Sequence, residues 1–333
     1  MTILVTGAAG FIGSNFILDW FRESNEDVVS LDLLTYAGDL RNLSSLDKNP
    51  HHHFIHGNIA DKHLVLELLK KYHIRAVVHF AAETHVDRSI LKPDYFIETN
   101  IVGTFHLLEC IRDYWDNLNQ DLKKDFRFLH VSSDEVYGSL DYDSPPFFEG
   151  QRYHPNNPYS ATKAASEHLV NAWHRTYGLP ILITNSSNNF GPRQHPEKLI
   201  PSCILNAKNN LPIRIYGDGK QIRDWFYVQD HCRAISKILK QGQVGETYNV
   251  GGWNEKTNLE VVENLCAVMD ELKPKLDGGS YRDQITFVED RPGHDIRYAI
   301  DASKLERELN WRPEETFKTG LRKTVLWYLE YET

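Results

Sequence analysis

Short apolar runs alternate with longer segments of helical periodicity through the first 187 residues. The apolar runs are "TILVT" (2–6), "DVVSLD" (27–32), "HFIHG" (53–57), "RAVVHFAA" (75–82), "FRFLHVSS" (126–133) and "PILITNSS" (180–187). Between them, segments such as "FIGSNFILDWFRE" (11–23) repeat apolar residues at the spacing of one helix face. Strands that alternate with helices predict an α/β fold, a doubly wound parallel sheet with helices on both faces.

Beyond residue 187 the alternation loosens. Turns such as "YGDGKQ" separate further helical segments, which we expect near 197–208, 229–240, 259–271, 303–309 and 316–331. We place a soft boundary at residue 188. Residues 1–187 then form the larger domain and residues 188–333 mainly a smaller mixed α/β domain, with some crossing of the chain between the two lobes.

The charge balance excludes one large class of partners. The chain has 37 basic and 46 acidic residues, a formal net charge of −9. A general nucleic-acid binder needs the opposite sign, so we expect no nucleic-acid partner. An anionic substrate would need locally placed Arg or Lys side chains.

The cysteines and the first residues point to a reducing compartment. Cys110, Cys203, Cys232 and Cys266 are far apart, so neither a disulfide framework nor a zinc site is indicated. The histidines at 51–53 also lack metal-ligand spacing, and we expect no metal. The chain begins without a basic leader and has no apolar run of the roughly 18 residues that a membrane helix needs. We therefore expect a cytoplasmic protein.

The segment "GAAGFIG" joins the first predicted strand to the first helix. Gly7, Gly10 and Gly13 allow a tight turn and a close approach of the backbone to a pyrophosphate at the helix amino end. The second strand ends in Asp32, at the interval of about 20 residues expected for an acid that binds the adenosine ribose. Leu33 and Leu34 follow it instead of an Arg, which favours NAD over NADP. The fold is thus predicted to be of the Rossmann type.

Tyr159 and Lys163 lie four residues apart in "YSATK", on one face of a predicted helix. An ammonium at this distance can favour tyrosinate and lower the pKa of the phenol, which would make it a base. Ser133 ends a strand 26 residues earlier. This order resembles the short-chain dehydrogenase/reductase superfamily and its extended branch, which acts mostly on nucleotide sugars. The resemblance implies that Tyr159 takes a proton from a sugar hydroxyl while Ser133 and Lys163 assist it.

Two adjacent acids, Asp134 and Glu135, follow Ser133 and are not needed for simple oxidation. If a hexose is first oxidised at C4, its C5 proton becomes acidic, and a carboxylate can remove it. A second carboxyl that stays protonated can then donate a proton to the C6 hydroxyl as it leaves as water. The alternative interpretation is a polar turn, because Asp and Glu are common in turns.

A closer resemblance covers almost the whole chain. "GAAGFIGSNF", "LTYAGDL", "AAETHVDRSI", "SSDEVYG", "NPYSATKAASEHLV", "SNNFGPRQHPEKLIP" and "DRPGHDIRYAID" are similar to the dTDP-glucose 4,6-dehydratase family. This resemblance implies that Asp134 is the acid and Glu135 the base. It also implies conversion of dTDP-glucose to dTDP-4-keto-6-deoxyglucose with tightly held NAD, in a pathway to rhamnose, lipopolysaccharide or antibiotic sugars.

The resemblance also implies the binding residues. For NAD these are Gly7, Gly10, Phe11, Ile12, Gly13, Asp32, Leu33, Leu34, Thr35, Asn58, Ile59, Phe80, Ala81, Ala82, Glu83, Thr84, Thr99, Tyr159, Lys163 and Asn189. For the nucleotide sugar they are Thr84, Ser133, Asn188, Lys198, Leu199, Arg214, Ile215, Tyr216, Arg223, Asn258, Asp290, Arg291, Pro292, Gly293 and His294. Three positions depart from the usual family residues: Ser133 replaces Thr, Asn58 replaces Asp, and Thr84 replaces Ser.

Other functions remain open at the level of sequence. The same scaffold carries dehydratases for UDP- or GDP-hexoses and 4-epimerases or decarboxylases, and a catalytically silent NAD sensor is a further alternative. The long helical segments 94–115 and 156–177 are rich in apolar and aromatic residues. In the superfamily the corresponding helices form a four-helix interface, so the resemblance implies a homodimer.

Overall fold

The structure is a computed structural model that describes residues 2–290 and 294–330. Its larger sheet contains β1 (Thr2–Thr6), β2 (Asp27–Asp32), β3 (His52–His56), β4 (Ile74–His79), β5 (Arg127–Ser133), β6 (Ile181–Ser186) and β10 (Thr247–Val250). The spatial order is β10-β6-β5-β4-β1-β2-β3, and all neighbouring strands are parallel. The predicted Rossmann-type sheet is therefore confirmed.

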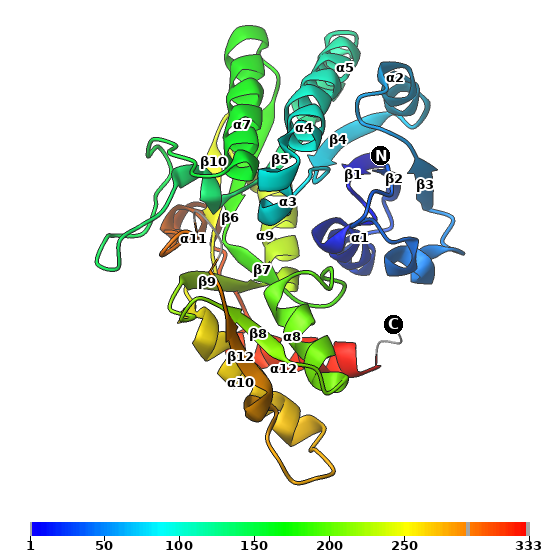
Figure 1. Cartoon of the computed structure of the whole chain (residues 1–333). Coiled ribbons are helices and arrows are strands. Elements are labelled where there is room, and N and C mark those ends of the chain that lie inside the picture. The colour runs from blue at the N-terminus through cyan, green and yellow to red at the C-terminus, as the bar shows by residue number, and fades with distance from the viewer. Residues whose placement is uncertain (1, 291–293, 331–333) are drawn as a thin grey trace.

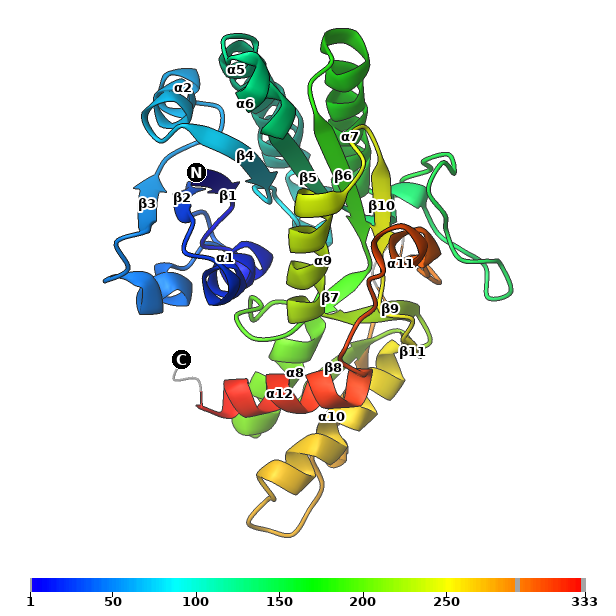
Figure 2. The same cartoon turned by 180° about the vertical axis from the view of Figure 1, so that it is seen from behind.

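Helices cover both faces of this sheet (Figures 1 and 2). On one face lie α1 (Phe11–Glu23) and α9 (Val228–Gln241), and on the other α2 (Lys62–Lys71), α5 (Thr104–Asp116) and α7 (Pro158–Tyr177). Alternate residues of each strand point to opposite faces, so Ile3 and Val5 pack with the first group while Leu4 packs with the second. This alternation is why the strands are apolar on both sides.

The segment before α5 includes the start of the helix expected over 94–115, part of it as a π-helix. It contains α3 (Val86–Leu91), α4 (Pro93–Phe96) and a π-helix (Ile97–Gly103), after which α5 begins. Within the π-helix, the Asn100 side chain accepts a hydrogen bond from Glu83 N (2.8 Å) and donates one to Glu83 O (3.0 Å). The long helix expected over 94–115 is therefore present, with a π-helical stretch in it, and such stretches are frequent at functional sites.

The C-terminal residues form two small sheets and a second core. β7 (Asn188–Phe190), β9 (Ile222–Tyr227) and β11 (Glu255–Thr257) form one sheet, and β8 (Ile213–Tyr216) and β12 (Ile285–Val288) the other. Around them pack α8 (Leu199–Lys208), α10 (Asn258–Leu272) and α12 (Phe317–Glu330). The expected mixed α/β architecture is confirmed. β10 leaves this region and joins the larger sheet, so the chain crosses between the lobes.

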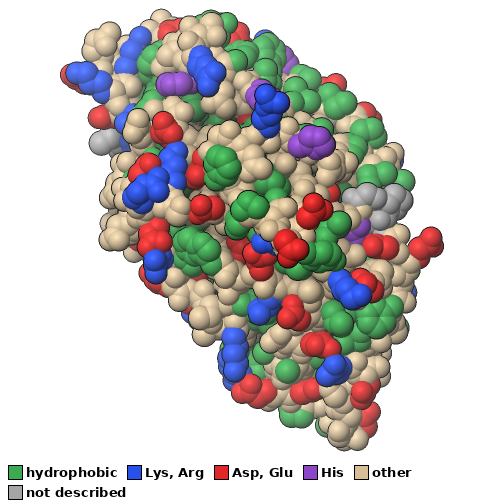
Figure 3. All heavy atoms as spheres, turned by 90° about the vertical axis from the view of Figure 1, so that its left-hand side faces the viewer, with side chains coloured by type: hydrophobic (Ala, Val, Ile, Leu, Met, Phe, Trp, Pro, Cys, Tyr) green, Lys and Arg blue, Asp and Glu red, His purple; other side chains and the backbone are tan. Residues whose placement is uncertain are grey.

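The remaining elements are short. They are α6 (Gln120–Asp125), α11 (Ser303–Leu309) and the 3₁₀ helices Leu40–Leu46, Asp134–Tyr137 and Tyr281–Gln284. All four cysteines are buried and free. In the described part of the chain, no helix is long and apolar enough to cross a membrane. Acidic and basic side chains are mixed over the face in Figure 3, so the net negative charge does not gather into one patch there.

Candidate active site

A cleft of about 310 Å³ lies at the carboxyl ends of the parallel strands. Its lining comes from the ends of β1, β2, β4, β5 and β6 and from the segment after β7. β1 and β4 are neighbours in the sheet although they are not consecutive in the chain, so the strand order reverses beside them. Open α/β sheets bind ligands at such a reversal, and a volume of roughly 300 to 1,000 Å³ is usual for ligand sites.

The glycine turn after β1 is packed too tightly for a side chain at Gly7 or Gly13. Gly7 has a φ of +68°, and a Cβ there would lie 2.6 Å from Ala81 N. A Cβ on Gly13 would lie 2.2 Å from Gly7 O. Among the described residues, no side chain caps the amino end of α1 at Gly10. The turn therefore offers backbone N–H groups and a positive helix end to a diphosphate.

Asp32 lies at the end of β2 with 9% of its surface exposed. Its carboxylate accepts hydrogen bonds from Ala9 N (2.9 Å) and Leu34 N (2.7 Å), and burial raises its pKa. This fixed acceptor suits the hydroxyls of an adenosine ribose. Together with the glycine turn, it means that the residues present fit NAD.

Leu34 differs from the other predicted NAD residues because it does not line the cleft. Its side chain packs against the core around α1 and its backbone has a φ of +54°, so it acts through the hydrogen bond to Asp32. Asn58 does line the cleft, and its Oδ1 accepts from Ala60 N (2.9 Å). Where an Asp would keep a second acceptor oxygen, Asn58 has an amide nitrogen.

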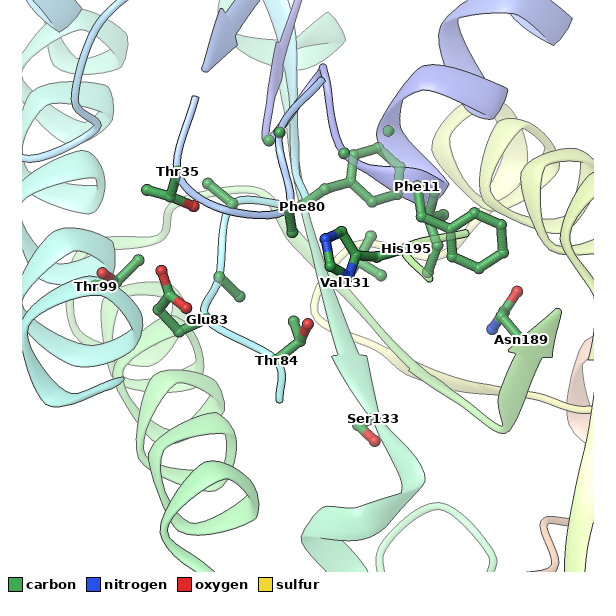
Figure 4. Close-up of a pocket in the computed structure, with 18 of the residues that line it drawn as sticks. Phe11, Thr35, Phe80, Glu83, Thr84, Thr99, Val131, Ser133, Asn189 and His195 are labelled. Carbon is green, nitrogen blue, oxygen red and sulfur yellow. The ribbon is translucent and has the colours of Figure 1, made fainter. Parts of the chain in front are cut away.

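The remaining residues predicted to bind NAD all line the cleft. Figure 4 shows Thr35, Glu83 and Thr99 gathered on one side of it. Burial raises the pKa of Glu83, while the Arg88 charge and a hydrogen bond with Thr35 oppose this rise. The loop after β2 and the loop after β4 therefore meet at this side of the cleft.

Ser133, Tyr159 and Lys163 meet where β5 ends and α7 begins. Asn157 caps α7 with its side chain, and the helix presents Tyr159 and Lys163, 8% and 4% exposed, to the cleft. Lys163 Nζ donates to Val131 O (2.8 Å), and burial lowers the Lys163 pKa to about 8.

The tyrosine environment corrects one expectation from the sequence. Burial raises the pKa of Tyr159 well above its usual value, and the Glu135 charge adds to this rise, while a hydrogen bond with Ser133 opposes it. The Lys163 ammonium donates to the Val131 carbonyl, and burial and the nearby carboxyls outweigh the hydrogen bond with Ser133 in setting the direction of the Tyr159 pKa. The positive ring of an oxidised nicotinamide next to the phenol would favour tyrosinate.

Asp134 and Glu135 begin the 3₁₀ helix that follows β5, but their surroundings differ. Asp134 is 2% exposed, and its Oδ2 has no hydrogen-bond partner among the described residues. Burial raises the Asp134 pKa well above its usual value, and the charge of Glu135 adds to this, while Arg223 opposes it. Glu135 is half-buried, and Asn157 Nδ2 lies 3.5 Å from its Oε2. Burial therefore favours the protonated form of one carboxyl beside a more accessible neighbour, the arrangement that acid–base elimination requires.

The predicted substrate residues fall into two groups. Thr84, Ser133, Asn188 and Lys198 line the cleft, and Lys198 Nζ donates to Thr84 O (3.2 Å). Eight residues lie outside the cleft lining, on β8, β9, α8 and α10 and on the chain after β12: Leu199, Arg214, Ile215, Tyr216, Arg223, Asn258, Asp290 and His294. Arg291, Pro292 and Gly293 lie outside the described residues.

Contacts join several members of the second group. Asp290 accepts from Gln221 Nε2 (2.9 Å) and pairs with His294 Nδ1 (2.7 Å). Ile215 is buried in the second core, whereas Arg214 and Tyr216 are exposed on β8. Exposed Arg214 and Tyr216 are thus able to meet a ligand from β8, while Ile215 supports the strand from behind.

Arg223 links this second group to the acid pair. Its guanidinium donates to Asp295 O (3.0 Å), stacks 4.3 Å from the ring centre of Tyr298, and lowers the Asp134 pKa against the effect of burial. A buried cation therefore lies on the side of the cleft where the smaller sheets begin, a suitable place for a diphosphate.

Several cleft residues were not predicted from the sequence. They are Leu31, Ala37, Gly38, Gly57, Val131, Ser132, Ser186, Ser187, Gln194, His195 and Glu197. Ser186 and Ser187 end β6, and their position at the carboxyl end of a parallel strand could have indicated them. Gln194, His195 and Glu197 directly precede Lys198 in "RQHPEK". The parallel sheet, the glycine turn and the Ser-Tyr-Lys set together define a nicotinamide-dependent enzyme of the extended short-chain dehydrogenase/reductase type.

Comparison with known proteins gives the family. The family model described as GDP-mannose 4,6 dehydratase matches residues 4–324. dTDP-glucose 4,6-dehydratase of Salmonella typhimurium is 54% identical over 99% of this chain and 93% of its own. The structure of DesIV, a dTDP-glucose 4,6-dehydratase from Streptomyces venezuelae with NAD bound, is 43% identical, with a TM-score of 0.89 over 99% of this chain and 97% of that one. UDP-glucose 4-epimerase of Thermotoga maritima is 26% identical with a TM-score of 0.87, over 99% of each chain. The chain belongs to the dTDP-glucose 4,6-dehydratase family, and the resemblance predicted from its motifs is confirmed.

Proposed function

We propose that this chain converts dTDP-glucose to dTDP-4-keto-6-deoxyglucose and water, as an NAD-dependent hydro-lyase. The observation that carries the proposal is the acid pair at the end of β5, where buried Asp134 keeps its proton beside half-buried Glu135. Both line the same cleft as Ser133, Tyr159 and Lys163. Full-length relatives at more than half identity carry the same activity in their names.

The first step is oxidation at C4 of the glucose. Tyr159, as phenolate, removes the proton of the C4 hydroxyl, and Ser133 donates a hydrogen bond that steadies the same oxygen. NAD, when bound, would accept the hydride from C4 and give it back to C6, while Glu135 returns the proton to C5, so the overall reaction has no net redox change. Lys163 donates a hydrogen bond to the Val131 carbonyl and supplies positive charge near the phenol.

The second step is elimination of water between C5 and C6. The new C4 ketone makes the C5 proton acidic, and Glu135 removes it. Asp134 donates its proton to the C6 hydroxyl, so that the C6–O bond breaks and water leaves. Burial keeps Asp134 protonated before this step, which is what a general acid needs.

Two alternatives use the same scaffold without this pair. A 4-epimerase oxidises and reduces C4 and needs neither a C5 base nor a proton donor for C6, and an NAD sensor needs no base at all. Neither accounts for a buried, protonated carboxyl directly beside the oxidation set. Dehydratases of UDP- or GDP-hexoses would use such a carboxyl in the same way. The choice of dTDP as the nucleotide therefore rests on the names of the relatives.

A direct assay separates these functions. Purified protein is incubated separately with dTDP-glucose, UDP-glucose and GDP-mannose, and the products are analysed by mass spectrometry. We expect loss of one water from dTDP-glucose and from neither of the others. Loss of water from another nucleotide sugar would contradict the choice of nucleotide, and loss from none of the three would contradict the dehydratase itself.

We propose further that the protein is a cytoplasmic homodimer. α5 and α7 lie side by side on one face of the larger sheet (Figure 1). Ala161, His168 and Ala172 form an exposed stripe along α7, and its two alanines would allow a second helix to approach closely. Tyr95 and Ile97 add exposed apolar surface just before α5, at 58% and 46%. Four buried free cysteines suit a reducing compartment.

A further inference from the structure

Glu167 is a fully buried carboxyl that the reaction steps above do not use. It lies on α7 one turn after Lys163, with 0% of its surface exposed. Oε1 accepts from Ser132 Oγ and from Asn185 Nδ2, the latter at 2.8 Å, and Oε2 accepts from the Tyr153 hydroxyl. Three donors to one carboxyl favour its charged form and so act against burial, which favours the protonated form.

We propose that Glu167 is a positioning residue of the active site, whose carboxylate fixes the end of β5 and keeps Lys163 in its charged form. The inference rests on the proposed dehydratase function and deepens it. Ser132 directly precedes Ser133, and Asn185 Nδ2 also donates to Ser133 O (3.2 Å). The Glu167 carboxylate therefore holds both neighbours of the strand end that carries Ser133, Asp134 and Glu135.

Lys163 needs such a partner because it is itself buried. Burial lowers the Lys163 pKa to about 8, and the charge of Glu167 opposes this lowering. His79 on β4 and His130 on β5 also face Lys163, but burial lowers the pKa of both, so they stay neutral. Tyr159, one turn earlier on α7, has a raised pKa and is neutral in this state. Among these described neighbours, Glu167 is the one that supplies negative charge.

The groups around Glu167 preserve its charge in the range where Lys163 titrates. Tyr137 and Tyr153, from the segment that follows β5, both have raised pKa values and stay neutral. Burial raises the Glu167 pKa to about 7, while hydrogen bonds from Ser132 and Tyr153 oppose the rise. Glu167 is therefore ionised at the alkaline pH at which Lys163 loses its proton.

The test is the pH dependence of nicotinamide reduction in a single turnover with dTDP-glucose, compared between wild type and Glu167→Gln. A neutral amide no longer stabilises the ammonium, so the Lys163 pKa falls. The alkaline limb of the profile, where activity is lost as Lys163 deprotonates, should then move to lower pH by about one unit. A uniform loss of rate at every pH, with the limb in place, would overturn the inference.

Three further variants separate charge from hydrogen bonding. Tyr153→Phe and Ser132→Ala each remove one donor that lowers the Glu167 pKa but keep a carboxyl that can ionise, so the alkaline limb should move to lower pH by less than in Glu167→Gln. Glu167→Asp keeps the charge on a shorter side chain, so it should lower the maximum rate while the limb stays in place. If the alkaline limb of Glu167→Asp moves to lower pH by as much as that of Glu167→Gln, the role of charge is contradicted. If the Gln variant does not fold, a shift of about one unit in Glu167→Asp relative to wild type contradicts it equally.

The same series distinguishes the inference from the function on which it rests. Wild-type protein that releases no water from dTDP-glucose contradicts the proposed function. An active wild type whose alkaline limb is unchanged by Glu167→Gln contradicts the inference alone.

Discussion

Glu135 and Asp134 are adjacent, yet each should respond differently to loss of its carboxyl. Glu135→Gln removes the base for C5 and leaves Ser133, Tyr159 and Lys163 in place. Oxidation at C4 should continue while elimination slows by about 10²- to 10⁴-fold. Reduced nicotinamide should therefore accumulate on the enzyme, and its absorbance after mixing with dTDP-glucose measures this. Unchanged release of the 4-keto-6-deoxy sugar would contradict the assignment of Glu135 as the base.

Asp134→Asn should reduce activity and increase stability. Above the ordinary carboxyl pKa, Asp134 ionises in the unfolded chain but keeps its proton in the folded one, because burial raises its pKa. The free energy of unfolding therefore falls as pH rises through this range. An amide removes this dependence, so at neutral pH the variant should be more stable by roughly 1 kcal/mol, with elimination slowed at least about 100-fold. Denaturant unfolding at several pH values measures the stability.

Asp224→Asn is the matched control for this prediction. Asp224 is also buried with a raised pKa, but its carboxylate accepts from Gly252 N (2.9 Å) and Asn254 N (2.7 Å). An amide can replace only one of these acceptors, so this variant should lose about 1 to 3 kcal/mol. Equal loss of stability in both variants would contradict the prediction, because it would show that the Asp134 carboxyl is as well stabilised by its surroundings as that of Asp224.

At the scale of elements, the turn between β1 and α1 gives the clearest prediction. Gly13→Ala places a methyl group where Gly7 O already lies 2.2 Å from the ideal Cβ position. The start of α1 must then move away from the turn, and the amino end of the helix no longer faces the diphosphate. We expect bound NAD to be lost on gel filtration, measured from the absorbance of the eluted protein. Gly279→Ala, where the nearest atom is 3.3 Å away on a side chain, should retain NAD.

Local signals explain which elements could be predicted from the sequence. α7 begins after Asn157, whose side chain caps it, and ends before Gly178, which has a φ of +74°. α11 was expected over 303–309 and has those bounds. The π-helical stretch was not predicted, and the contact made from within it, between Asn100 and Glu83, joins residues that are 17 positions apart. Periodicity records the face that a segment buries, not a side chain that interrupts its backbone hydrogen bonds.

In the candidate site, too, the residues with a local sequence signal were predictable and the others were not. The glycine turn, Asp32 and the Ser-Tyr-Lys set were predictable because each lies at the end of a strand or the start of a helix. Burial opposes the predicted lowering of the Tyr159 pKa, and it could not be foreseen because spacing along a helix reveals Lys163 but not how deeply the phenol is buried. Glu167 carried no recognisable signal, because its partners Ser132, Tyr153 and Asn185 come together only in the folded chain.

At the scale of the whole molecule, the two lobes contribute different parts of one site. The larger sheet brings the cofactor residues and the acid pair to one cleft, and the smaller sheets place Arg214, Tyr216 and Arg223 beyond it. Arg223 on β9 acts on the Asp134 pKa across the boundary. β10 ties the lobes together by joining the larger sheet beside β6. A domain boundary at 188 stays a prediction, because pairing of β10 with β6 means that neither lobe is one continuous stretch of chain.

The proposed dimer makes the last prediction. Ala172 is exposed on α7, and Ala172→Arg would place a long charged side chain between two helices that must approach closely. We expect this variant to sediment as a monomer at micromolar concentration while wild type sediments as a dimer. Ala267→Arg, a change of the same kind on the exposed face of α10, should leave the dimer intact.

Because the stripe on α7 begins at Ala161, between Tyr159 and Lys163, the monomer should also hold these two residues less firmly and turn over more slowly. A wild-type protein that sediments as a monomer, or a variant at position 172 that remains a dimer, would exclude α7 as the interface.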